Sequence, residues 1–260
     1  MSPISEDNLR QTIVEIGRRM YQRGYVAAND GNISVRLDGE RILTTPTGIS
    51  KGFMKPESMV IVDHHGRTLS EGTPSTELPL HLFIYKERQD VQAVVHSHPP
   101  YATGFATAGL ALDKCVLAEV VVTIGTIPLA EYGTPSTEEL PDTLRPYIHS
   151  CEAFLMANHG VVTVGSDLMD AYFKLERVEH YAKIVFIARA LGGERVLSKQ
   201  EVEKLYDLRD VYGVKSLNPG CYACYHECIG EPCVNYDIKY NPEGANYFNE
   251  IVEKVLTAVR

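Results

Sequence analysis

The sequence predicts an α/β fold built on a largely antiparallel sheet. Short β-branched apolar runs and longer helical patterns are mixed along the chain, without the strict strand–helix alternation of a doubly wound parallel sheet. The 260 residues suffice for one large domain or two small ones. Hydrophobic residues make up 44% of them and charged residues 23%, a composition that excludes a wholly disordered chain.

An amphipathic helix is expected first, over residues 5–24, because apolar side chains recur there at helical spacing and Gly24 follows as a stop. Short β-like runs come next, separated by Gly and Pro turns, at 33–37, 42–45 and 59–62. Residues 77–88 have a helical pattern. The β-branched run at 91–95 is typical of a buried strand and ends at His96.

Further elements follow the same patterns. They are a helix at 100–108, strands at 116–122 and 126–129, a helix at 136–148, strands at 153–156 and 161–164, and helices at 167–191 and 198–212. Ser136 and Glu139 form a capping-box pattern at the start of one helix. After Gly213 the chain becomes rich in Gly, Pro, Cys and Tyr, with a last helix at 247–258. We therefore expect one domain over residues 1–213 and a cysteine-rich C-terminal extension over 214–260.

The charge and the apolar runs limit the possible partners. The net charge of −9 argues against a nucleic acid or an anionic membrane surface, although it does not exclude a small anionic substrate. No apolar run is long enough to cross a bilayer. The charged N-terminus does not resemble a signal peptide, so the sequence predicts a cytoplasmic protein.

Three histidines and one carboxylate indicate a metal site. His96 and His98 follow the expected strand at 91–95, and residues i and i+2 of an extended segment point to the same side. His159 lies in a turn after another apolar strand. Three imidazoles are a common zinc set, to which Glu77 could add a fourth ligand or a base. An H-x-H pair alone also fits surface histidines, so the pattern leaves both interpretations open.

Polar turns indicate an anion pocket. They combine hydroxyl or amide side chains with backbone N–H groups, and they contain Asn32, Thr47, Gly48, Ser75 and Thr76. Ser75 and Thr76 precede the helix expected from residue 77, where the helix dipole favours an anion. Each segment by itself also fits an ordinary turn or helix cap.

Five motifs together resemble the class II aldolase/adducin family. They are GNISVR (31–36), TPTG (45–48), PSTELPLH (74–81), VVHSHP (94–99) and ANHGVV (157–162). They occur in the order and at the spacing of that family, and the resemblance covers residues 5–213. The family implies a three-layer α/β/α sandwich around an antiparallel sheet, and a homotetramer with active sites at subunit interfaces.

The resemblance also implies roles for residues. His96, His98 and His159 would bind one Zn²⁺ per subunit, or another divalent ion. Glu77 would ligate the resting metal and then act as acid and base. The phosphate pocket of a small sugar-phosphate substrate would contain Asn32, Thr47, Gly48, Ser75 and Thr76.

The implied reaction is reversible cleavage of a ketose 1-phosphate to dihydroxyacetone phosphate and an aldehyde, through a metal-stabilised enediolate. Glu77 favours an aldolase, since the family's epimerases usually carry aspartate there. The family's aldolases use a tyrosine from a neighbouring subunit at the aldehyde oxygen, whereas this chain has Glu119 or a nearby valine at that point. Tyr212 matches a C-terminal tyrosine of the family and is a candidate for that role. The alternatives are an epimerase, dehydratase or decarboxylase, or a non-catalytic adducin-like interaction module.

Four cysteines of the C-terminal extension form a separate cluster. Cys221, Cys224, Cys228 and Cys233 have the spacing C-x2-C-x3-C-x4-C, which lies outside the family resemblance. Such a density of thiolates can bind zinc or an iron–sulfur cluster. Free or packed thiols explain the same spacing, so a second metal site is one of two interpretations.

Overall fold

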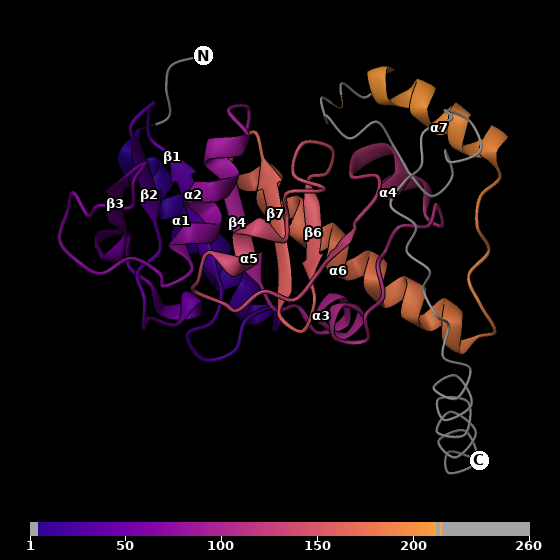
Figure 1. The fold of residues 1–260 in the computed structure, drawn as a ribbon, viewed down its shortest axis with the longest axis horizontal. Helices are drawn as coiled ribbons and strands as arrows, with labels where there is room; N and C mark the ends of the chain where they lie inside the picture. The colour runs from indigo at the N-terminus through magenta and orange to yellow at the C-terminus, as the bar shows by residue number, and fades with distance from the viewer. Residues whose placement is uncertain (1–4, 212–213, 215–260) are drawn as a thin grey trace, which may run out of the picture.

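One sheet of seven strands crosses the molecule in the order β3-β2-β1-β4-β7-β6-β5 (Figure 1). The computed structural model describes residues 5–211 and 214 of the chain. The strands are β1 (Asn32–Arg36), β2 (Arg41–Thr44), β3 (Val60–Asp63), β4 (Ala93–Ser97), β5 (Leu129–Ala130), β6 (Ala153–Met156) and β7 (Gly160–Gly165).

The sheet is mixed, which corrects the expectation of a largely antiparallel sheet. Neighbouring strands from β3 to β6 pair antiparallel, but β5 pairs parallel with β6, with Ala130 opposite Met156. The reason is the connection between these two strands, which passes through helix α5 (Glu139–Asp142) and brings the chain back to the same end of the sheet.

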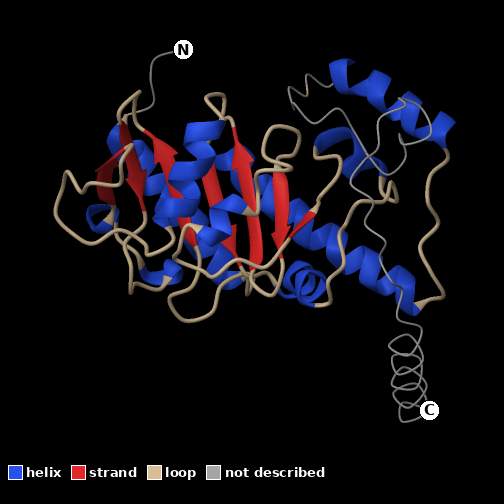
Figure 2. Cartoon of the chain, in the orientation of Figure 1, coloured by secondary structure: helices blue, strands red, loops and turns tan. Residues whose placement is uncertain are grey.

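Helices cover both faces of the sheet, as Figure 2 shows by colour. One face carries α1 (Glu6–Gln22), α3 (Pro100–Thr107) and α6 (Leu168–Ala190), whose apolar side chains join one core cluster. The other face carries α2 (Leu78–Glu87) and α5, which belong to a second cluster. Near the β5 end, α4 (Ala118–Thr123) packs against α7 (Lys199–Val211). Two short 3-10 turns, η1 (Lys51–Phe53) and η2 (Pro56–Ser58), complete the elements.

The apolar run of strand β4 is continuous because both faces of this strand are buried. Ala93 and Val95 face the α1–α6 cluster, while Val94 faces the α2 cluster, so both sides of the strand are buried. Because side chains alternate along a strand, His96 follows Val94 onto the α2 side. The fold thus directs this imidazole toward the N-terminus of α2.

The helix boundaries predicted for α1 and α6 are confirmed to within two residues. The Ser5 hydroxyl accepts a hydrogen bond from the Asn8 N–H at the start of α1. The Asp167 carboxylate accepts one from the Asp170 N–H at the start of α6. These N-terminal caps satisfy backbone donors that have no partner inside the helix.

Two predicted elements are wrong. The run at 116–122 was expected as a strand, but residues 118–123 form α4, because Val120 packs into the main core while Val121 packs against the α7 side. Burial on two sides overrides the β propensity of valine here. The helix expected at 136–148 is reduced to the four residues of α5. Ser136 has a left-handed φ of 64° and does not cap it.

Parts of the expected organisation lie outside the described residues. These are the extension beyond residue 214, its helix at 247–258, Tyr212, and the four cysteines Cys221, Cys224, Cys228 and Cys233. Among the helices that the structure does describe, each is too short or too polar to span a bilayer.

Candidate metal centre

Three imidazoles meet at one end of the sheet. His96 lies on β4, His98 directly follows that strand, and His159 lies in the turn between β6 and β7. Because β4 pairs with β7, with His96 opposite Val162, the turn at His159 is brought beside the end of β4. One ring nitrogen from each histidine lies within 4.8 Å of the other two. The structure therefore brings together all three histidines that the sequence singled out.

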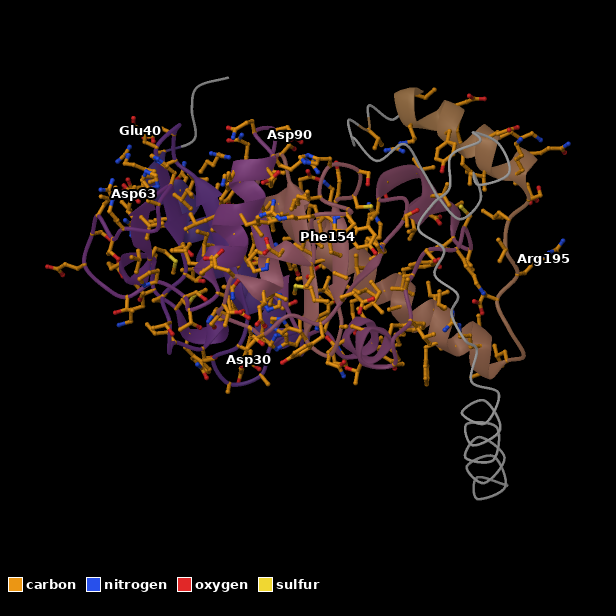
Figure 3. The ribbon with its side chains drawn as sticks, in the orientation of Figure 1. Asp30, Glu40, Asp63, Asp90, Phe154 and Arg195 are labelled. Atoms are coloured by element: carbon orange, nitrogen blue, oxygen red, sulfur yellow. The ribbon has the colours of Figure 1, made fainter. Side chains whose placement is uncertain are left out.

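The carboxylate of Asp30 lies next to the histidines and shows at which end of the sheet they are found. Asp30 Oδ2 lies 3.5 Å from His98 Nδ1. In Figure 3, Asp30 marks the lower edge of the molecule, whereas Asp90, which precedes β4, lies at the opposite edge. The His98–Asp30 pair places a carboxylate behind the imidazole, an arrangement that raises ligand basicity in metal sites.

The hydrogen bond of His96 orients its ring. Its Nδ1 lies 2.8 Å from the carbonyl oxygen of Val161, which can only accept, so Nδ1 carries a proton and Nε2 is the nitrogen that faces Glu77 and His98. That Nε2 lies 3.2 Å from Nε2 of His98. Two nitrogens bound to one zinc ion at roughly 2.0–2.1 Å in tetrahedral geometry would be about 3.3 Å apart. The spacing therefore fits a shared metal ion.

Glu77 completes the donor set. Its Oε2 lies 3.2 Å from His96 Nε2 and its Oε1 lies 3.0 Å from His159 Nε2. A carboxylate oxygen facing an imidazole lone pair is repulsive unless a cation, either a proton or a metal ion, is shared between them. Three imidazole nitrogens and one carboxylate are ligands that zinc accepts, so these residues fit a zinc-type divalent ion.

Charges inside the cluster shift its pKa values in opposite directions. Burial raises the pKa of Glu77, but the charges and hydrogen bonds of His96 and His159 outweigh it and hold this pKa well below its usual range. Burial lowers the pKa of His96, but Glu77 raises it overall. Burial, together with His96 and His159, lowers the pKa of His98 to about 4. At neutral pH His98 is thus in the neutral form that binds metals.

The amide of Asn32 holds the carboxylate of Glu77. Its Nδ2 donates to Glu77 Oε2 at 2.7 Å, and its Oδ1 lies 2.5 Å from His81 Nε2. Both ends of this buried amide are therefore engaged by the protein. Asn32 lies at the metal centre, beside the anion pocket for which the sequence proposed it.

The remaining residues of the predicted anion pocket lie on two adjacent loops. The Thr47 N–H donates to Thr73 O at 3.0 Å, and the Ser75 N–H donates to Thr45 O at 3.1 Å. Thr47, Gly48 and Thr76 are exposed. Since Thr76 directly precedes Glu77, these hydroxyls adjoin the metal centre at the N-terminus of the ten-residue helix α2.

Gly160 lies in close contact with the histidine cluster. The left-handed residue of the β6–β7 turn is Asn158, with φ of 55°, and Gly160 already belongs to β7. A Cβ atom on Gly160 would lie 2.6 Å from His98 Cδ2 and 2.6 Å from Ser97 O. Glycine is needed here because the His98 ring packs directly on the backbone.

Sequence reasoning missed the buried cation Lys51. Its side chain is 1% exposed, and its Nζ donates to Asn29 O at 2.9 Å and to Ile49 O at 2.8 Å. It therefore ties together the loops that precede Asn32 and follow Gly48. Burial lowers the pKa of Lys51 to about 8, against opposing effects of Asp30 and Glu77. Lysine is usually exposed, so no local signal in the sequence points to it.

The loop between β5 and α5 lies beside the site. Ser136 and Thr137 of this loop adjoin Glu77 and Pro79. The Ala157 N–H donates to Ala130 O at 3.0 Å, which ties the start of that loop to the turn carrying His159. The loop after β5 thus forms a further wall of the site.

Comparisons with known proteins match the segments that build this site. The family model described as Class II Aldolase and Adducin N-terminal domain matches residues 11–186. A 3-oxo-tetronate 4-phosphate decarboxylase of Haemophilus influenzae is 36% identical over 203 residues, covering 75% of this chain and 95% of the relative. An L-fuculose phosphate aldolase of Methanococcus maripaludis is 36% identical over 178 residues, covering 68% of this chain and 96% of the relative.

Solved structures agree in fold. YgbL of Klebsiella pneumoniae, described as a putative aldolase/epimerase/decarboxylase, superposes with a TM-score of 0.72 at 31% identity, covering 78% of this chain and 99% of YgbL. An L-fuculose 1-phosphate aldolase has the same TM-score at 29% identity, covering 80% of this chain and 98% of that one. With the family model matched over both the strands and the loops that build the metal centre, the chain belongs to the class II aldolase and adducin family.

Proposed function

We propose that this protein is a zinc-dependent lyase that breaks a carbon–carbon bond beside a carbonyl group in a phosphorylated sugar. The main form of the proposal is cleavage of a ketose 1-phosphate to dihydroxyacetone phosphate and an aldehyde. One observation carries it: the Glu77 carboxylate lies 3.2 Å from His96 Nε2 and 3.0 Å from His159 Nε2, directly after the hydroxyl-bearing residues Ser75 and Thr76.

The phosphate of the substrate fits the two loops next to Glu77. Thr47, Ser75 and Thr76 offer hydroxyl groups, and Gly48 and Thr76 offer backbone N–H groups at the start of α2. Behind these loops the buried ammonium of Lys51 adds positive charge. A phosphate held there would place the adjoining carbons of the sugar at the histidine cluster.

A divalent ion held by His96, His98 and His159 would polarise the substrate carbonyl and offset the negative charge that develops on it. Glu77 is the group placed to move the proton. In the condensation direction its ionised carboxylate takes a proton from the carbon next to the carbonyl, and in the cleavage direction it returns that proton. Asn32 keeps the carboxylate pointed at the cluster through its 2.7 Å hydrogen bond.

Decarboxylation of a 3-oxo sugar acid phosphate is the second candidate, and a specific feature favours it. In aldol cleavage a base must remove a proton from the hydroxyl that becomes the aldehyde. The family resemblance places Glu119 or a nearby valine where the family's aldolases carry a tyrosine for that step, and Glu119 is an exposed residue of α4. Loss of CO₂ needs no such base, because the departing carboxylate is already ionised. The remaining carbon takes up one proton from water, which Glu77 would relay to it.

Product analysis separates the two reactions. The zinc-loaded protein is incubated with L-fuculose 1-phosphate and, separately, with carboxyl-¹³C-labelled 3-oxo-tetronate 4-phosphate. An aldolase forms dihydroxyacetone phosphate from the first substrate, and a decarboxylase releases labelled CO₂ from the second. An aldolase also exchanges a carbon-bound proton of dihydroxyacetone phosphate in D₂O without any aldehyde, which proton NMR detects. Absence of all three activities in zinc-loaded protein would contradict the proposal and favour a non-catalytic interaction module.

The assembly proposed for this enzyme is a cytoplasmic homotetramer with active sites between subunits. It is supported by the family resemblance and by the open position of the site, since Thr47, Gly48 and Thr76 are exposed in the single chain. Light scattering coupled to gel filtration should give about four chain masses. A monomer that retains full turnover would contradict the shared site.

A further inference from the structure

A file of five polar side chains runs from Glu77 into the core between β1 and α2. Glu77 Oε2 accepts from Asn32 Nδ2 at 2.7 Å, and Asn32 Oδ1 lies 2.5 Å from His81 Nε2. His81 Nδ1 lies 2.6 Å from Ser34 Oγ, which lies 2.8 Å from Tyr85 Oη. The four residues behind Glu77 are at most 2% exposed, so the file is shielded from water.

The two elements interleave because their repeats match. Glu77, His81 and Tyr85 are spaced by four residues along α2, a rise of about 6 Å per step. Asn32 and Ser34 are spaced by two residues along β1, a rise of about 6.7 Å. Each strand side chain therefore fits between two helix side chains, and a hydrogen bond joins each side chain to the next.

The donors and acceptors of these groups allow only one direction for the hydrogen bonds along the file. Glu77 as a carboxylate only accepts, so Asn32 must present its NH₂ group to it and its carbonyl oxygen to His81. His81 must then donate from Nε2. Burial and the charge of His96 lower the pKa of His81 to about 3, so the ring is neutral and its Nδ1 accepts from the Ser34 hydroxyl. Ser34 in turn accepts from Tyr85.

We infer that His81 is a positioning residue for Glu77: its neutral Nε2–H tautomer fixes the Asn32 amide so that the amide holds the Glu77 carboxylate against His96 and His159. The alternative arrangement, with the Asn32 amide reversed, would put its carbonyl oxygen against the carboxylate. His81 excludes that arrangement because its Nε2–H needs an acceptor and both His81 and Asn32 are buried away from water. The effect on turnover rests on the proposed role of Glu77, but the effect on metal binding does not.

The test is a cycle of variants read by zinc affinity, measured on the full chain by competition with a chelator. His81→Phe removes both hydrogen bonds at similar size and should weaken zinc binding by about 10–100-fold, the usual range for residues behind a metal ligand. In a Glu77→Ala background the same substitution should change zinc binding less than about threefold, because no carboxylate remains to be held. Equal losses in both backgrounds would overturn the inference, since they indicate general damage.

If His81→Phe fails to fold, a conservative variant and neutron diffraction test the inference about His81 instead. His81→Gln keeps a donor near the position of Nε2 and should retain zinc affinity within about threefold; a loss as large as that expected for phenylalanine contradicts the inference. Neutron diffraction from crystals exchanged into D₂O should show deuterium on His81 Nε2 and none on Nδ1. Deuterium on Nδ1 overturns it. Neither readout needs turnover, so failure of the proposed reaction is recognised separately.

Discussion

Glu77 Oε2 and His96 Nε2 lie 3.2 Å apart, which joins the first residue before α2 to the end of β4. The hydrogen bond from His96 Nδ1 to Val161 O turns the other ring nitrogen toward this carboxylate. These two atoms attract each other only when a proton or a metal ion is shared between them, so the pair would link metal binding to the proposed acid–base group. The predictions below separate these two functions.

Removing one imidazole should remove the metal. His96→Ala is expected to abolish stoichiometric zinc and turnover, because His96 is one of the three proposed ligands and is completely buried. Elemental analysis of protein purified without added metal gives the zinc content, and far-UV circular dichroism checks the fold. The control is His149→Ala at a side chain that is 65% exposed, where about one zinc per chain should remain. Retention of zinc and turnover in His96→Ala would refute the site.

Changing the carboxylate to an amide should separate binding from chemistry. Glu77→Gln keeps the shape and an oxygen ligand but cannot take up a proton, so zinc should remain near one per chain while kcat falls by about 10²–10⁴-fold. Steady-state kinetics and elemental analysis on the same preparation measure both. Glu71→Gln, at an exposed position of the preceding loop, is the matched control. Normal turnover in Glu77→Gln would exclude Glu77 from the proton transfer.

A methyl group on Gly160 should displace the His98 ring without changing its chemical groups. The new Cβ would lie 2.6 Å from His98 Cδ2 and from Ser97 O, and the backbone atom cannot yield as a side chain can. We expect Gly160→Ala to weaken zinc binding at least about tenfold. Gly104→Ala is the control: this exposed helical glycine has open space around it, so alanine should leave zinc binding unchanged and raise stability by about 0.5–1 kcal/mol. Unchanged zinc affinity in Gly160→Ala would show that the His98 ring has room to move.

The buried ammonium of Lys51 should make stability depend on alkaline pH. Its pKa is lowered to about 8 from 10.5, so between these values the unfolded chain holds a proton that the folded chain has released. Stability therefore rises with pH in this window, by at most about 1.4 kcal/mol per pH unit for this one group. Below pH 8 the cost of burying the charge is present in full.

Substitution of Lys51 isolates this contribution. Denaturant unfolding of the wild type and of Lys51→Met from pH 7 to pH 10 should show the wild type gaining stability relative to the variant above pH 8. Lys55→Met, at an exposed lysine near the same turn, should show no such divergence. A constant difference between wild type and Lys51→Met across the range would mean that the ammonium stays charged in the folded state.

Much of the site could be predicted from the sequence because its signals are local. The H-x-H pair at His96 and His98 depends only on the two-residue repeat of an extended chain, and Ser75 and Thr76 precede a helix whose start is marked by its own residues. The long helix α6 could also be predicted, since its apolar period and its Asp167 cap lie within one segment. These features need no knowledge of what packs against them.

By itself, the sequence determined the family, the approximate limits of the main elements, and the candidate ligands Glu77, His96, His98 and His159. Only the tertiary structure decided that 118–123 is helical, that β5 runs parallel to β6, that Asn32 is engaged at both ends and that Lys51 is buried. The physical reason is the same in each case. Local propensity and periodicity act within a few residues, whereas burial and hydrogen-bond partners depend on which distant segments meet, and that is decided by packing of the whole sheet.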